Sequence, residues 1–122
     1  LITAVQEHVK INVAIVNNGY LGMVRQWQEL FYEGRYAATP ILSPDFVKLA
    51  DAYGIPGERV ERRSDLAAAV ARARAAAGTA LVEFKVEQED SVYPMVPAGA
   101  ALHEMIRRPA PSALAETGAD PA

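Results

Sequence analysis

Two asparagines and a glycine, Asn17, Asn18 and Gly19, stand between an apolar run and a segment with helical spacing. The side-chain oxygen of Asn18 is a hard ligand, of the kind that Mg²⁺ accepts together with backbone carbonyls and ligand phosphates. Gly19 lets the backbone turn so that a carbonyl one or two residues later can face the same ion, and Gly22 permits a ligand to approach the backbone closely. These residue types could therefore hold a divalent ion and a phosphate group.

A plain turn is the competing interpretation, and the Asn-Gly dipeptide alone favours it, because it is a strong hairpin signal. However, no second strand follows. The turn instead joins the carboxyl end of an apolar strand to a helix that begins near Met23, and open α/β sheets bind ligands at such places. The amide end of that helix also favours a phosphate. The residues alone leave both interpretations open.

The elements around this corner are predicted from the spacing of apolar residues. Residues 1–8 look like the end of a buried helix, and the β-branched run at 11–16 predicts a strand covered on both faces. From Met23 the apolar positions recur at i, i+1, i+4, i+7 and i+8, which predicts a helix with one apolar face. Residues 33–42 have the composition of a loop.

The second half of the chain predicts two capped helices and two strands. These are a helix over 43–54 capped by Ser43 and ended by Gly54, a strand at 58–62, a helix over 64–78 capped by Ser64 and ended by Gly78, and a strand at 79–87. The charged side chains of Glu83 and Lys85 predict an edge or a partly open face for the last strand. The alternation of elements predicts an α/β fold, part of an open, mostly parallel doubly wound sheet, truncated at its amino end.

Composition limits the classes of function. The 122 residues carry a net charge of -3 and no cysteine, so a nucleic-acid binder, a disulfide framework and a thiolate metal site are not expected. No apolar run approaches the roughly 18 residues that span a bilayer, so no membrane contact is expected. A cytoplasmic location fits these features. We expect a folded domain at 1–90, a separate arm at 91–107 and a disordered tail at 108–122.

The segment "NNGYLGMVRQWQ" and, at the proper distance, "PMVPAGAALHEMI" resemble the carboxyl-terminal thiamine-diphosphate domain of the acetolactate synthase catalytic subunit. "LITAVQE", "SPDFVKLADAYGIPG" and "ALVEFKVEQEDSVY" resemble further pieces of the same domain, so the likeness covers residues 1–108. By this resemblance, the Asn18 side chain and the Tyr20 carbonyl bind Mg²⁺, which holds the cofactor's diphosphate. Leu21, Gly22 and Met23 would lie along the cofactor.

The resemblance also implies what this chain lacks. The family's motif starts at Gly-Asp-Gly, and its aspartate, the first metal ligand, would lie before Leu1. The glutamate that activates the cofactor and the FAD site belong to other domains, so no catalytic acid or base is assigned here. We therefore expect the isolated chain to be inactive. The segment at 91–107 would fold back near the active-site entrance.

Met23 and Trp27 lie four residues apart and so share one helix face. Such a pair is more often part of a core. In the family this face borders the pocket for the 2-keto acid substrates, and the residue at Trp27 favours an acceptor with a longer side chain. The neighbouring Arg25, Gln26 and Gln28 are expected on a solvated face or a subunit contact.

The implied reaction joins two pyruvates, or pyruvate and 2-ketobutyrate, with loss of CO₂, at the start of branched-chain amino-acid synthesis. Implied partners are a second catalytic subunit, in a homodimer or tetramer, and a regulatory small subunit. Another thiamine-diphosphate carboligase, such as glyoxylate carboligase, shares the corner and is an alternative. A non-catalytic remnant that binds a partner is the alternative from a different class.

Overall fold

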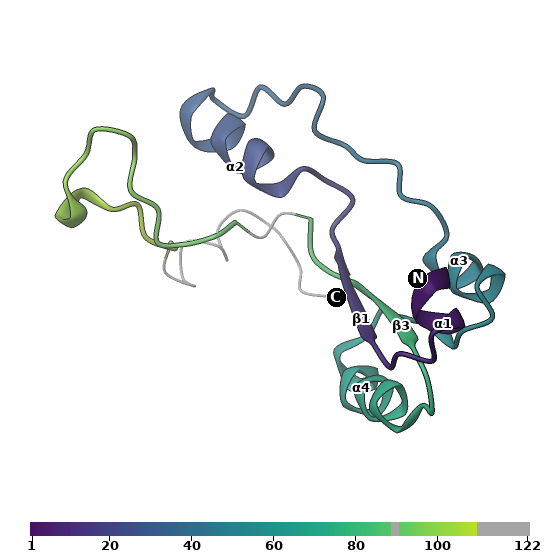
Figure 1. Cartoon of the computed structure of the whole chain (residues 1–122). Helices are drawn as coiled ribbons and strands as arrows, with labels where there is room; N and C mark the ends of the chain where they lie inside the picture. The colour runs from purple at the N-terminus through teal and green to yellow at the C-terminus, as the bar shows by residue number, and fades with distance from the viewer. Residues whose placement is uncertain (89–90, 110–122) are drawn as a thin grey trace. The chain divides into compact units, whose positions relative to one another are not determined.

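A computed structural model describes residues 1–88 and 91–109, and the chain divides into two units, Leu1–Asp90 and Ser91–Ala122. The first unit carries the sheet (Figure 1). Its elements are, in order, α1 (Ile2–Gln6), β1 (Asn12–Asn17), α2 (Gly22–Phe31), α3 (Phe46–Ala52), β2 (Gly57–Val60), the 3-10 turn η1 (Arg63–Asp65), α4 (Leu66–Ala75) and β3 (Ala80–Lys85). The predicted order of helices and strands is confirmed, although most elements are shorter than predicted.

The described residues form a sheet of three parallel strands in the order β1-β3-β2. The strand predicted at an edge, β3, is therefore the central one, and the expectation of an open face around Glu83 is wrong. Glu83 is 1% exposed. Local alternation of apolar and charged residues cannot distinguish an open face from a buried ion pair, because the partner, Arg59, lies on another strand.

Helices cover both faces of the central strand, with α1 and α3 on one side and α4 on the other (Figure 1). Leu81 packs with Ala50 of α3 and Ile55, whereas the next residue, Val82, packs with Ala69 of α4 and Val60. Successive side chains of a strand point to opposite faces, so one strand serves both clusters. This arrangement confirms the predicted α/β class.

One face of β1 is uncovered in this chain, contrary to the prediction for that strand. The side chains of Ala14 and Val16 are exposed, Val16 to 70%. Those of Val13 and Ile15, on the opposite face, pack against the cluster beneath α3. The reason is that α4, the helix on that face of the sheet, packs on β3 and β2.

The two predicted serine caps are wrong. Helix α3 begins at Phe46 and its cap is Asp45, whose carboxylate accepts hydrogen bonds from the amides of Val47 and Lys48. Ser43 instead donates its hydroxyl to Asn17 at 3.4 Å. Ser64 lies inside η1, and α4 starts at Leu66 without a side-chain cap.

Of the two glycines predicted to end helices, only one does so. Gly54 has the predicted left-handed backbone, with φ of 68°. Gly78 does not, since α4 ends at Ala75 and its C-cap is Ala76. A left-handed glycine therefore ends α3 as predicted, while α4 ends without one.

In the second unit, a short β-bridge joins the two ends of a loop. Met95 and Ile106 form an antiparallel bridge through two backbone hydrogen bonds of 2.9 and 2.7 Å. A 3-10 turn, η2 (Leu102–Glu104), lies between them. The guanidinium of Arg108 lies 5.5 Å from the centre of the Tyr93 ring. Most of the tail predicted to be disordered, residues 110–122, lies outside the described residues.

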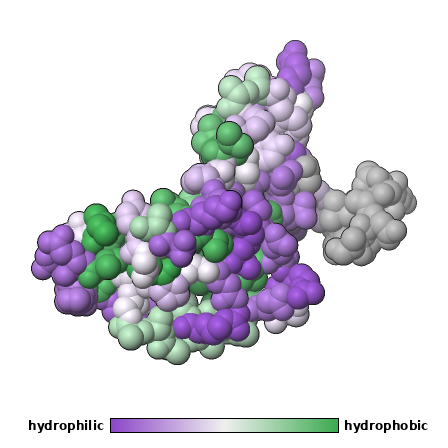
Figure 2. Space-filling model, turned by 90° about the vertical axis from the view of Figure 1, so that its right-hand side faces the viewer, coloured by the Kyte–Doolittle hydropathy of each residue, from purple (hydrophilic) through white to green (hydrophobic). Residues whose placement is uncertain are grey.

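Hydrophobic side chains remain at the surface between hydrophilic ones (Figure 2). Several of the exposed apolar residues lie on α2 or just before and after it: Leu21, Met23, Val24, Trp27, Phe31 and Tyr32. In the part of the chain that the structure describes, no helix is both long and apolar enough to cross a bilayer.

Candidate functional site

The corner begins where β1 leaves the sheet. Asn17 is buried, and its side-chain oxygen accepts a hydrogen bond of 3.0 Å from the Gly19 amide. This bond closes a turn over the side chain of an asparagine, as such residues often do. Gly19 has φ of 72°, which a residue with a side chain adopts only with strain. The turn leads into helix α2 and not into a second strand, which confirms the predicted connection from strand to helix.

Asn18, the predicted metal ligand, forms a second turn of the same kind. Its side-chain oxygen accepts a hydrogen bond of 3.1 Å from the Tyr20 amide. A carbonyl-type oxygen has two lone pairs, so this bond leaves acceptor capacity on the Asn18 oxygen. A Cβ atom on Gly22 would lie 3.1 Å from the Asn18 amide nitrogen, which is tighter than most real contacts. Glycine at position 22 therefore keeps space beside the Asn18 side chain.

The loop after α2 returns to the corner and fixes the backbone of Tyr20. The Leu21 amide donates to the Thr39 carbonyl at 2.9 Å, and the Ile41 amide donates to the Gly19 carbonyl at 2.8 Å. The bridge between Tyr20 and Pro40 is antiparallel. The Tyr20 carbonyl, the second predicted metal ligand, takes no part in either of these bonds.

Helix α2 starts at Gly22, directly after the corner, with Leu21 as a cap that makes no side-chain hydrogen bond. The first amides of a helix carry a partial positive charge and favour a phosphate. The residues predicted to lie along the cofactor, Leu21 and Met23 among them, are thus brought to the amide end of a helix, beside the turn that carries Asn18.

Arg25 is buried at 7% exposure, as is Gln26 at 3%, so their predicted solvated face is wrong. The Arg25 guanidinium lies over two aromatic rings, 5.0 Å from the centre of the Tyr20 ring and 4.7 Å from that of the Tyr36 ring. It also donates to the Gln88 carbonyl at 2.7 Å. A cation over the face of an aromatic ring is held electrostatically. The hydrogen bond to Gln88 links α2 to the chain that leaves β3.

Met23 and Trp27 do not belong to a core in this chain. Their side chains are 56% and 51% exposed, and they lie on the same face of α2. The core interpretation therefore does not hold within the described residues. An exposed thioether and indole next to the corner are available to line a pocket.

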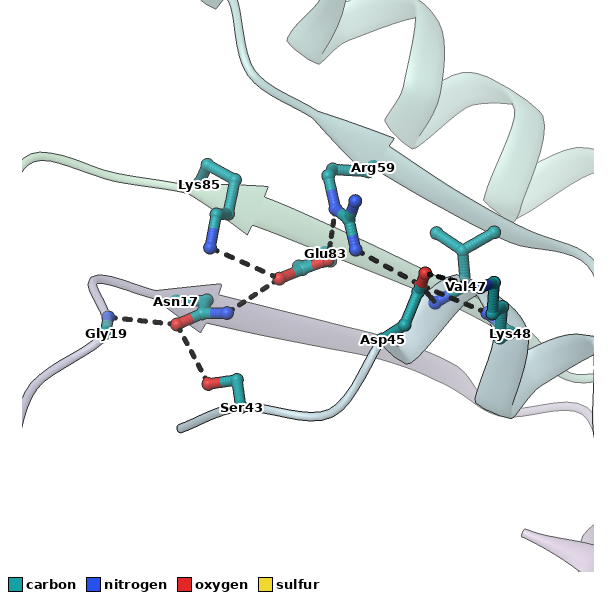
Figure 3. Close-up of polar contacts among 9 residues, drawn as sticks. All are labelled: Asn17, Gly19, Ser43, Asp45, Val47, Lys48, Arg59, Glu83 and Lys85. Carbon is teal, nitrogen blue, oxygen red and sulfur yellow. Dashed lines mark hydrogen bonds and ion pairs between the residues drawn. The ribbon is translucent and has the colours of Figure 1, made fainter. Parts of the chain in front are cut away.

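A charged network lies behind the corner (Figure 3). One oxygen of the Glu83 carboxylate accepts from the Asn17 side-chain amide at 2.6 Å, and the other accepts from Arg59 at 2.7 Å. The ammonium of Lys85 lies 3.8 Å from the first oxygen. Arg59 also donates to Asp45, the cap of α3, at 3.2 Å. Polar side chains from all three strands, those of β2 and β3 charged, thus meet behind the turn.

Opposing effects act on the pKa of Glu83. Burial raises it, but the hydrogen bonds from Arg59 and Asn17 and the charges of Arg59 and Lys85 outweigh burial, so this pKa lies below its ordinary value. The pKa of Asp45 is also lowered, first by the hydrogen bond from the Lys48 amide and then by Arg59. Both groups are carboxylates at neutral pH.

The residues present fit a Mg²⁺ and diphosphate site in part. Asn18 and Tyr20 supply two neutral oxygens, Gly22 leaves space beside them, and the amides of α2 suit a phosphate. Among the described residues, no group of three or more histidine and carboxylate side chains is placed to hold a metal ion.

These features are those of a cofactor-binding α/β domain. Residues 1–84 match the family described as thiamine pyrophosphate enzyme, C-terminal TPP binding domain, and the chain belongs to this family.

Known relatives agree with this assignment. The chain is 48% identical over 106 residues to a mitochondrial acetolactate synthase of Schizosaccharomyces pombe, covering 87% of this chain and 16% of the relative. It is 44% identical over 111 residues to an acetolactate synthase of Mycobacterium bovis, covering 86% and 18%. The large subunit of acetolactate synthase isozyme 2 of Escherichia coli is 35% identical over 107 residues, with 87% and 20% covered. The chain therefore spans about a fifth or less of the length of these relatives.

A solved structure shows the same fold. It is the thiamine diphosphate-dependent 4-hydroxybenzoylformate decarboxylase of Rhodococcus jostii RHA1, which superposes with a TM-score of 0.65 at 29% identity. The match covers 74% of this chain and 17% of the decarboxylase. The α/β fold predicted from the sequence is that of a thiamine-diphosphate enzyme domain.

Proposed function

We propose that this chain is the cofactor-binding carboxyl-terminal part of an acetolactate synthase catalytic subunit, which condenses two pyruvates, or pyruvate and 2-ketobutyrate, with loss of CO₂. The observation that carries the proposal is the double asparagine turn at the end of β1, which opens directly into α2. Relatives named acetolactate synthase from fungi and bacteria, at 35% to 48% identity, support it.

In this proposal the corner binds the metal and the diphosphate. The Asn18 side chain and the Tyr20 carbonyl hold Mg²⁺, and Leu21, Gly22 and Met23 lie along thiamine diphosphate. When bound, the cofactor supplies a thiazolium ring that acts as the electron sink for decarboxylation of a 2-keto acid. This chain contributes binding and orientation, and we assign no acid or base to it.

The exposed face of α2 would meet the substrates. Met23 and Trp27 border the pocket for the acceptor 2-keto acid, where a flat ring and a flexible thioether contact its alkyl side chain. The product would feed branched-chain amino-acid synthesis. The metal ion, FAD in another domain, a homodimer or tetramer, a regulatory small subunit and a cytoplasmic location belong to the same proposal. The fungal relative, from Schizosaccharomyces pombe, is named as a mitochondrial protein.

The test is Mg²⁺ binding and turnover by the full-length protein that carries this chain. Calorimetry at fixed thiamine diphosphate should give a higher Kd for Mg²⁺ in Asn18→Ala, by about 10-fold to 100-fold, since even an outer-shell change costs that much. Asn12→Ala, an exposed asparagine at the other end of β1, is the matched control and should bind as the wild type does. An unchanged Kd in Asn18→Ala would contradict the metal role.

The product assay separates the proposed reaction from its neighbours. Incubation with pyruvate should give acetolactate. Release of CO₂ and an aldehyde without acetolactate would favour a decarboxylase, the activity that the name of the structural relative carries. Condensation of glyoxylate would favour glyoxylate carboligase. Failure to bind thiamine diphosphate would favour the non-catalytic alternative.

A further inference from the structure

A buried carboxylate stands directly behind the proposed cofactor corner. The strand register places Ile15, Glu83 and Arg59 in one row across the sheet. Asn17 lies two residues after Ile15 on β1 and therefore on the same face. Glu83 on the central strand is thus within reach of both neighbours (Figure 3). Burying a carboxylate is costly unless it is paired and hydrogen-bonded, and here Arg59 and Asn17 meet that need.

The contact between Glu83 and Asn17 fixes which way the Asn17 amide faces. A carboxylate only accepts hydrogen bonds, so the Asn17 side chain must turn its NH₂ group toward Glu83. Because the amide is planar, its oxygen then faces the opposite way, toward the Gly19 amide and the Ser43 hydroxyl. The turn at Gly19 is therefore held in place by an anion on a neighbouring strand.

We propose that Glu83 is a positioning residue for the metal and diphosphate corner, which acts through Asn17 to set where Asn18 and Tyr20 present their oxygens. Arg59 is its counter-ion, and the bond from Arg59 to Asp45 couples the same carboxylate to the start of α3. This inference rests on the proposed function. Neither Glu83 nor Asn17 is placed as a metal ligand, so their role is indirect.

A purely structural ion pair would behave differently. It would change the stability of the fold and leave the metal affinity of the folded molecules unchanged. If Glu83 is a positioning residue, replacing it changes the affinity for Mg²⁺. The same replacement has no further effect in a protein that already lacks the Asn17 side chain. The experiment therefore measures the Kd for Mg²⁺ and the coupling between positions 83 and 17.

The proteins compared are the full-length wild type, Glu83→Gln, Asn17→Ala and the double variant, studied by calorimetry at fixed thiamine diphosphate. The matched control is Glu58→Gln, which removes an ion pair with Arg72 on the other face of the same sheet. Each single variant at 83 or 17 should raise the Kd by about 10-fold or more. The double variant should bind Mg²⁺ no more weakly than the single variant with the higher Kd. The Kd of the control, Glu58→Gln, should differ from that of the wild type by less than about twofold.

Each outcome decides one part of the inference. If the wild type does not bind thiamine diphosphate, the proposed function fails, and this inference with it. If the wild type binds and Glu83→Gln behaves like Glu58→Gln, the positioning role is overturned and the proposed function stands. If the effects of the two single variants multiply in the double variant, Glu83 does not act through Asn17.

One variant covers the case in which Glu83→Gln fails to fold. Asn17→Ala keeps the pair between Glu83 and Arg59 and removes the hydrogen bonds of the Asn17 side chain with Glu83, Gly19 and Ser43. A weaker Kd with kcat restored at saturating Mg²⁺ would support positioning. An unchanged Kd in this variant overturns the proposal.

Discussion

At the scale of the residue, the two adjacent asparagines have different tasks. Asn17 faces into the sheet and joins Glu83 to the turn, whereas Asn18 keeps its oxygen on the Tyr20 amide at the corner itself. Residue types at the corner single out Asn18 as a candidate ligand, because Mg²⁺ accepts amide oxygens, and its metal role stays a prediction. The role of Asn17 could not be predicted, since it depends on Glu83, 66 positions away along the chain.

Arg25 was missed for a similar reason. Its position on α2 beside Gln26 and Gln28 is typical of a polar, solvated face, and helical spacing carries no information on loops that return later. The rings of Tyr20 and Tyr36 and the Gln88 carbonyl enclose it only in the folded chain. An arginine between tyrosines five and eleven positions away would have been the available signal.

Trp27→Leu should change the preference between pyruvate and 2-ketobutyrate as acceptor. The indole is 51% exposed, so the substitution removes pocket surface without opening a core cavity. A change in side-chain contact with the acceptor is worth on the order of 10-fold in the ratio of the two products. Competition between the two acceptors in the full-length enzyme measures this ratio.

Phe31→Leu is the control for that substitution, since Phe31 is the last residue of α2, one helical turn further from the corner than Trp27, and is 44% exposed. Its product ratio should stay within about twofold of the wild type. A fixed ratio in Trp27→Leu would show that the indole does not border the acceptor.

The charge of Glu83 should make a contribution to stability that depends on pH. Its pKa is lower in the folded chain than the ordinary value of 4.5, so its contribution is complete above about pH 4.5 and is lost as the pH falls below that value. The difference in thermal midpoint between the wild type and Glu83→Gln, followed from about pH 7 to about pH 3.5, should therefore shrink at the acid end. A difference that stays constant over this range contradicts the assignment of a charged Glu83.

At the scale of the element, spacing predicts which segments are helices and strands better than it predicts where they start. Ser43 was the predicted cap of α3, but its hydroxyl is bonded to Asn17, and Asp45 caps the helix instead. Strand order is likewise not a local property. Residues 82–85 of β3 alternate between apolar and charged, and only pairing with β2 shows that Arg59 neutralises Glu83 in the centre of the sheet.

Close contact between α3 and β2 depends on Gly57. A Cβ atom there would lie 2.6 Å from the Cβ of Ala50 and 3.2 Å from the Val47 carbonyl. Gly57→Ala should therefore push α3 away from the sheet and lower the free energy of unfolding by about 1–3 kcal/mol, the usual cost of overpacking. The measurement is the shift in thermal midpoint.

Gly78→Ala is the matched control, because nothing lies within 4 Å of an added Cβ and the backbone is not left-handed. It should leave stability unchanged or raise it by up to about 1 kcal/mol. If Gly57→Ala had the same thermal midpoint as Gly78→Ala, α3 would have to pack more loosely against β2 than described.

At the scale of the whole molecule, the uncovered surfaces bear on what the chain can do alone. One face of β1 and the apolar face of α2 are exposed, with Val16 at 70% and Trp27 at 51%. Apolar surface of this kind commonly marks a contact with another part of a protein. The relatives are at least five times longer than the matched region, which covers 15% to 20% of them.

The chain by itself should form no acetolactate from pyruvate when thiamine diphosphate, Mg²⁺ and FAD are supplied. Its two proposed ligands, Asn18 and Tyr20, are neutral oxygens, and Mg²⁺ in proteins is usually bound through at least one carboxylate as well. The Kd for Mg²⁺ should therefore be much higher for the chain than for the full-length enzyme. A colour assay for acetolactate, with the full-length enzyme run alongside, tests this. Robust turnover by the chain would mean that the corner is a complete site, and that the charge holding the metal comes from residues not yet assigned to it.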